Sequence, residues 1–245
     1  MRTVQLRSTI FLPQNIGYTP ESAEKFANLL MPDSRAYSIV QPGMSMLGVN
    51  PNAPQYGMPW RLFKKSGTGE YNIAFQPGKI DIVLAKEVLC DDAFEKSFCD
   101  ECIHYFSKIL ESLSPSSPSV VTRIAYAPLY AITQDDPLFQ SLWANLLKKT
   151  LYNGNQIQDT NLSFLLKGIL KFGGKEVQMN FLHNIFDGNQ IKSEGSSQIV
   201  RKVILFQLDL NSIPESNLNM DTQGVADFFS TILSVKNNLV ANVTE

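Results

Sequence analysis

The sequence predicts an α+β protein that is a tandem duplication, with helices packed on one face of a curved antiparallel sheet. Three observations support this prediction. Each half contains several expected strands, and the connections between them are short enough for an antiparallel meander. A stretch of serine and proline, SPSSPS at 114–119, lies near the midpoint of the 245 residues. Similar motifs occur in the same order on both sides of that stretch.

The first of these motifs marks a helix near the start of each half. A Thr-Pro pair at 19–20 precedes FANLL at 26–30, and an Asp-Pro pair at 136–137 precedes WANLL at 143–147 with identical spacing. In each pair a residue suited to the N-cap is followed by proline at the first helical position. We therefore expect equivalent helices at these two places.

The second motif marks the helix that closes each half. YFSKIL at 105–110 has a counterpart in FFSTIL at 228–233. The predicted unit is thus a strand, a helix, three or four antiparallel strands and a second helix. We expect a first α+β repeat at 1–114, a Ser/Pro linker at 115–119 and a second repeat at 120–245. The alternative is one continuous domain with pseudo-twofold symmetry.

Turn residues divide each half into strands. Pro77-Gly78-Lys79 and Gly173-Gly174 are typical of hairpin turns. The expected strands are 4–12, 36–40, 60–64, 71–76 and 80–86 in the first half, and 120–132, 162–172, 177–185 and 198–210 in the second. The last expected helix runs from about residue 223 to 240, with Val225, Phe228, Phe229, Ile232 and Leu239 on its buried side.

All three cysteines lie in the segment CDDAFEKSFCDECIHYF at 90–106. On a helical wheel Cys99 and Cys102 fall in the apolar half, and His104 lies about 160° from Cys102. A regular helix cannot bring that pair to one zinc ion. The acidic residues that follow Cys99 also disfavour a reactive thiolate. We therefore expect core cysteines, with no metal and no cofactor.

The start of this helix has a pattern of its own. Asp92 followed by Glu95 resembles a capping box, with Asp92 as N-cap. Glu95 is also the one charged residue that falls among the apolar positions of the wheel.

Composition argues against several classes of partner. The formal net charge is −2 and the sequence pI is near 5.8, so bulk electrostatics do not favour nucleic acid or an anionic membrane. No apolar run is long enough to span a bilayer, and the N-terminal residues do not resemble a signal peptide. Three cysteines do not suit a disulfide framework. We expect a cytoplasmic protein.

The irregular loop at 50–60 is the candidate binding segment. Tyr56, Met58 and Trp60 could anchor a peptide or protein partner. The alternative interpretation is that Trp60 begins a strand and belongs to the core.

Catalytic patterns are incomplete, and we assign no catalytic residue. The stretch GMSMLG at 43–48 is one residue too long for a nucleophile elbow, and His183 alternates with apolar residues as a half-buried strand residue would. Asp209, flanked by leucines, is expected to form a structural ion pair with Arg123 on a neighbouring strand. If Arg123, Asp209 and Tyr126 clustered in a cleft, the interpretation of the chain as an enzyme would be favoured.

The second half resembles a known family at short motifs. Val121-Thr122-Arg123-Ile124, the strand that contains Leu208-Asp209-Leu210 and the closing helix are similar to a sporadically distributed family of uncharacterised prokaryotic proteins. Ala125 stands where that family has glycine, and the Arg-Tyr-Ile-Asn that follows in the family is absent. The resemblance implies no activity.

The leading functional hypothesis is a non-enzymatic protein-interaction or scaffolding module, which binds a protein partner or self-associates. The alternative is a small-molecule or lipid-binding protein with a pocket between sheet and helices. An enzyme of unrecognised type is the third hypothesis.

Overall fold

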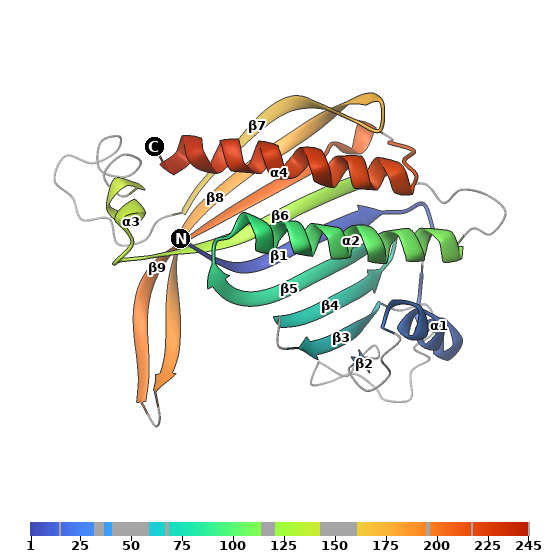
Figure 1. The fold of residues 1–245 in the computed structure, drawn as a ribbon, viewed down its shortest axis with the longest axis horizontal. Helices are drawn as coiled ribbons and strands as arrows, with labels where there is room; N and C mark the ends of the chain where they lie inside the picture. Colours follow the sequence, from blue (N-terminus) through green and yellow to red (C-terminus); the bar gives the residue numbers. More distant parts are fainter. Residues whose placement is uncertain are drawn as a thin grey trace.

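A computed structural model describes residues 1–14, 16–31, 37–40, 59–66, 69–113, 121–142, 161–194, 197–216 and 218–244. Nine strands form one antiparallel sheet in the order β2-β3-β4-β5-β1-β6-β9-β8-β7. The long helices α2 and α4 lie side by side against one face of this sheet (Figure 1). The predicted α+β class and antiparallel sheet are confirmed. The Ser/Pro stretch at 114–119 lies outside the described residues.

The strands and helices have the following bounds, in chain order: β1 Arg2–Phe11, α1 Pro20–Leu30, β2 Tyr37–Val40, β3 Trp60–Ser66, β4 Gly69–Gln76, β5 Lys79–Leu89, α2 Asp92–Leu113, β6 Arg123–Thr133, α3 Pro137–Leu142, β7 Asn161–Phe172, β8 Lys175–Glu194, β9 Ser197–Ser212 and α4 Thr222–Thr244.

The first strand of each half lies at the centre of the sheet. β1 pairs with β6 through residues such as Ser8 and Tyr126, and this pairing joins the halves into one sheet. β5 flanks β1 on one side, and β9 flanks β6 on the other. Both predicted hairpin turns are present, with glycine at a positive φ that other residues rarely adopt: Gly78 at 68°, and Gly173 and Gly174 at 55° and 70°.

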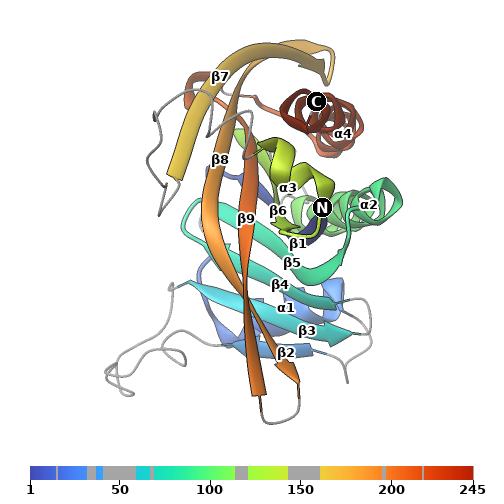
Figure 2. The ribbon, with the colours of Figure 1, turned by 90° about the vertical axis from the view of Figure 1, so that its left-hand side faces the viewer.

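The sheet bends around α4, and β7 passes over this helix (Figure 2). Two contacts fix that bend. The rings of Phe172 and Phe228 lie 5.4 Å apart, edge to face. The backbone N–H of Gly173 donates to the Asp227 carboxylate at 3.2 Å. The helices therefore fill the inside of the curve. Among the described residues no helix covers the other face of the sheet, which we call the open face.

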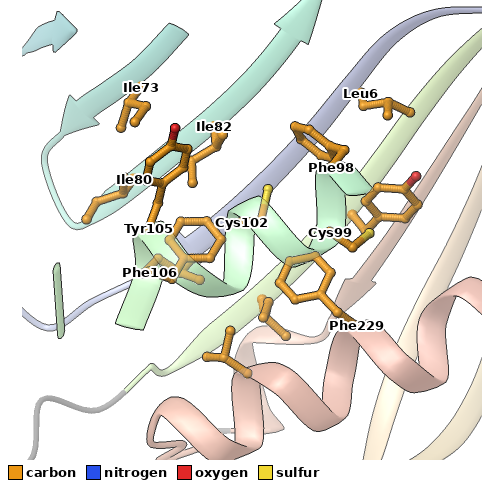
Figure 3. Packing of buried hydrophobic residues seen from close by; sticks show 14 of the residues in the cluster. Leu6, Ile73, Ile80, Ile82, Phe98, Cys99, Cys102, Tyr105, Phe106 and Phe229 are labelled. Atoms are coloured by element: carbon orange, nitrogen blue, oxygen red, sulfur yellow. The ribbon is translucent and has the colours of Figure 1, made fainter. Parts of the chain in front are cut away.

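A single cluster of buried side chains contains residues from both halves. Phe106 of α2 and Phe229 of α4 stack at 6.4 Å, and Cys99 and Cys102 pack in the same layer between helix and sheet (Figure 3). Burial of this apolar surface is the main force that holds helices and sheet together.

The caps of the helices agree only in part with the sequence. Thr19 caps α1 as expected, and its hydroxyl accepts from the Ser22 N–H while the Ser22 hydroxyl accepts from the Thr19 N–H. At α2, however, the prediction of Asp92 as N-cap is wrong. The Asp91 carboxylate accepts from the Ala93 N–H at 2.8 Å. Glu95 turns into the core because it has stronger partners there.

Those partners form a buried ionic cluster around the Glu95 carboxylate, which is fully buried. The hydroxyls of Tyr126 and Tyr130 on β6 donate to it at 3.0 and 2.8 Å. The Lys236 ammonium of α4 lies 3.0 Å from the same carboxylate, and 3.3 Å from the exposed Asp92. One carboxylate thus links α2, α4 and the centre of the sheet.

The cluster changes how its members titrate. Burial alone would lower the pKa of Lys236, but the charge of Glu95 and its hydrogen bond raise it. Burial, followed by the charge of Glu95, raises the pKa values of Tyr126 and Tyr130. Because folding raises all three pKa values, the cluster stabilises the folded state fully when the pH is below the ordinary tyrosine and lysine pKa values. It is lost as the pH rises through the raised values.

We predict that Glu95→Gln destabilises the protein by about 3–5 kcal/mol, because it leaves the Lys236 ammonium buried without its counter-ion. Lys236→Met should cost a similar amount. The double variant should lose much less than the two single losses combined. Urea unfolding measures each free energy.

Asp92→Asn is the matched control, since its carboxylate also contacts Lys236 but its side chain is 72% exposed. We expect it to cost less than about 1 kcal/mol. A Glu95→Gln protein as stable as this control would show that the buried carboxylate does not hold the helices.

Candidate functional site

Within the described ranges, the most unusual surface is the outer edge of β7, the last strand of the sheet. β7 has 12 residues, whereas the strand at the opposite edge, β2, has four. Soluble proteins commonly protect sheet edges by short strands, proline, bulges or charges, because an open edge can pair with another strand. β7 contains no proline, and its charged residues are Lys167 and Lys171. It is therefore an unusually accessible edge.

Large apolar side chains are exposed along this edge. The exposed fractions are 36% for Phe164, 49% for Leu165, 47% for Leu166 and 63% for Ile169. Covering a side chain of this size completely stabilises by about 1.5–3 kcal/mol. Contiguous exposed apolar residues of this kind mark interaction sites in soluble proteins. We call these four residues, with the outer backbone of β7, the β7 edge.

The β7 edge has two faces. Phe164 and Leu166 pair with His183 and Phe181 of β8, whose side chains are buried on the helix side of the sheet. Leu165 and Ile169 alternate with them and so lie on the open face. The edge can therefore contact a neighbouring strand on both sides of the sheet.

The hydrogen-bonding pattern shows which backbone groups of β7 are directed outward. In β8 the carbonyl of Gln178 accepts from the Ile213 N–H, which follows β9. Backbone groups of alternate residues point to the same side of a strand, so the N–H and C=O groups of the even-numbered residues of β8 point away from β7. Odd-numbered residues of β8 then bond to the even-numbered residues of β7 that pair with them. This leaves the N–H and C=O groups of odd-numbered residues, including Leu165, Lys167 and Ile169, directed to the free side.

Next to this edge, β8 and β9 extend beyond the sheet as a two-stranded arm (Figure 2). β7 pairs with β8 only as far as Phe186, and β6 pairs with β9 only as far as Val203. Within the described ranges, 189–194 and 197–202 pair only with each other. A hairpin without further packing is only marginally stable in water. The arm thus adds a second element that contact with another molecule would stabilise.

A polar pocket of about 160 Å³ lies on the open face at the centre of the sheet. Asp81 is 2% exposed at its margin, and it accepts from the Arg7 guanidinium at 2.8 Å and from the Thr9 hydroxyl at 2.5 Å. The residues that line the pocket are Arg7, Thr9, Phe11, Lys79, Arg123, Ala125, Ala127, Gln207, Asp209 and Asn211.

The two residues of the predicted ion pair both line this pocket. The Arg123 guanidinium stands 4.5 Å from the centre of the Phe11 ring and donates to the Ser212 carbonyl at 3.2 Å. Asp209 accepts from the Asn211 amide at 3.0 Å. An ion pair between Arg123 and Asp209 stays a prediction. Tyr126 lies on the opposite face of the sheet, bonded to Glu95, so the three residues do not form one cleft.

Of the three predicted anchor residues, the structure describes Trp60 alone, and Tyr56 and Met58 lie outside the described residues. Trp60 begins β3 and is 3% exposed. Its ring stacks on Phe75 at 4.2 Å, and its indole N–H donates to the Ile16 carbonyl at 3.2 Å. This is the arrangement that the alternative interpretation of Trp60 expected, with the side chain in the core. Partner binding by the loop stays a prediction.

Cys99, Cys102 and His183 lie in the core. Cys99 and Cys102 are buried, and burial is the main reason that their pKa values are raised. His183 is 1% exposed, so it is more deeply buried than expected. It bonds through Nδ1 to the Phe181 carbonyl at 3.2 Å, and burial lowers its pKa. In the part of the chain that the structure describes, no three His, Cys, Asp or Glu residues lie together as metal ligands would.

Comparisons of this chain with family models, with curated proteins and with solved structures find no match. Among the described residues, no helix is long and apolar enough to cross a membrane.

Sequence reasoning found β7 as a strand but missed it as a site. One signal was available. The run Phe164-Leu165-Leu166 breaks the alternation of a half-buried strand, because three consecutive apolar residues cannot all face the core. The position of β7 at the edge of the sheet depends on strand order, which the sequence pattern does not contain.

Proposed function

We propose that this protein is a non-enzymatic protein-interaction module that binds the strand of a partner along its β7 edge. The observation that carries the proposal is the combination of outward-directed backbone groups with four exposed apolar side chains on one long edge strand. Backbone hydrogen bonds would give affinity, and the apolar side chains would give specificity. The neighbouring arm of β8 and β9 would contact the same partner.

A matched pair of variants tests this function. Leu165→Lys places a charge in the middle of the β7 edge. Leu89→Lys places the same charge at the end of β5, where the Leu89 side chain is 68% exposed. Both side chains are exposed, so each change should alter the free energy of unfolding by less than about 0.5 kcal/mol. We expect native mass spectrometry of gently purified wild-type protein to detect a complex with a second polypeptide or a second copy of the chain. Leu89→Lys should keep this complex and Leu165→Lys should lose it.

Identification of the bound polypeptide and reassembly from purified components complete the test. A complex that survives Leu165→Lys as well as Leu89→Lys would contradict binding through the β7 edge.

The second candidate is small-molecule binding, which a pocket of about 290 Å³ between the β7–β8 turn and the start of α4 favours. Apolar Phe172, Val177 and Met220 line it together with charged Lys175 and Asp221. Its volume is near the lower limit for ligand pockets. Gly224 also lines the pocket, so the larger side chain of Gly224→Leu should reduce its volume. Extra mass on wild-type protein in native mass spectrometry, absent from Gly224→Leu, would support this function, and a bare chain in both would contradict it.

We also propose that the chain arose by duplication. The support is that each half contributes a central strand, a short helix that begins with proline, a set of outer strands and a closing helix. Membership in the sporadically distributed prokaryotic family is a further proposal, supported by the short motifs around Arg123 and Asp209 and by the closing helix.

A further inference from the structure

We propose that the strand that binds the β7 edge is β7 of a second copy of this chain, paired antiparallel about a twofold axis at Leu165. The proposal rests on the proposed function and names its partner. The pairing would join two nine-stranded sheets edge to edge.

Strand polarity and hydrogen bonding allow this arrangement. A twofold axis perpendicular to the sheet makes the two β7 strands antiparallel and keeps each face of the sheet on its own side. The odd-numbered residues, whose N–H and C=O groups are directed outward, must then bond to odd-numbered residues of the other copy. Four registers pair all the exposed apolar residues of the edge within β7, with the self-paired residue at Leu165, Leu166, Lys167 or Gly168.

Side-chain chemistry selects Leu165. An axis at Lys167 would place two ammonium groups directly opposite each other, which is destabilising. An axis at Leu166 would place Leu165 against the Lys167 ammonium and Phe164 against Gly168, which has no side chain to contact it. An axis at Gly168 would place Leu165 against Lys171, and Phe164 against Phe172, which is already buried.

An axis at Leu165 brings the exposed side chains together. Leu165 meets Leu165 on the open face, and Phe164 meets Leu166 twice on the helix side. Lys167 faces the Ser163 hydroxyl, which can accept a hydrogen bond from it. This register pairs residues 161–169, so it includes all four exposed apolar residues of the edge.

Charge does not oppose the contact. The chain has a formal net charge of −2, so two copies repel each other little. The interface of one strand pair is small, and we therefore expect a dissociation constant in the micromolar range.

Single cysteines at 165, 166 and 167 identify the register directly. Residues opposite each other in a hydrogen-bonded antiparallel pair have Cα atoms about 5.5 Å apart, which suits a disulfide. We expect mild oxidation of Leu165→Cys to give covalent dimer at least tenfold above Leu166→Cys and Lys167→Cys. Wild-type protein supplies the background from Cys90, the least buried of the native thiols.

Sedimentation equilibrium of wild-type protein up to about 100 µM checks the association without any substitution. A concentration-dependent dimer is expected, and Leu165→Lys should weaken it at least tenfold whereas Leu89→Lys should not. A monomer at every concentration, or preferred cross-linking at 166 or 167, would overturn the proposal. If the protein is monomeric but an identified partner is lost only with Leu165→Lys, self-pairing is wrong and the interaction function stands. If no partner is lost either, both are wrong.

Discussion

One buried carboxylate connects both long helices to the centre of the sheet. Glu95 of α2 accepts hydrogen bonds from two tyrosines of β6 and pairs with Lys236 of α4. Apolar packing alone would allow the two helices to slide, because hydrophobic contact has little directional preference. A buried charge with three fixed partners has one favourable position. This interaction orients α2 and α4 over the strands where the two halves of the sheet join.

With the helices fixed over the centre, the ends of the sheet differ in how they are covered. β7 contacts α4 near its end, at Phe172, whereas Phe164 and Leu166 in its first half are exposed. On the open face, the centre of the sheet around Asp81 is polar and internally paired, whereas Leu165 and Ile169 are apolar. Among the described residues, four of the six exposed large hydrophobic side chains therefore lie on β7, whose outer backbone groups face away from β8.

Much of the fold was predictable because its signals are local. The strands were placed close to their observed bounds, except that β8 continues to Glu194 instead of ending at 185, and turn glycines placed the hairpins. Glu95 was visible as a charge among apolar residues, but its partners come from β6 and α4, which only tertiary packing brings together. The expected capping box assigned Glu95 to the helix start and so placed the N-cap at Asp92, whereas Asp91 caps the helix. Predicting the β7 edge requires the order of the strands in the sheet. The sequence contains only a break in alternation at Phe164-Leu165-Leu166.

The central claim is that the outward backbone groups of β7 are hydrogen-bonded to another strand when the protein functions. Residue-resolved amide hydrogen exchange at low and high protein concentration tests this most directly. We predict that the amides of Ser163, Leu165 and Lys167 exchange rapidly when the protein is dilute and become protected as its concentration rises. Even-numbered β7 amides, already bonded to β8, should change little. Rapid exchange of the odd-numbered amides at every concentration, and equally in protein isolated with its bound partner, would contradict the claim.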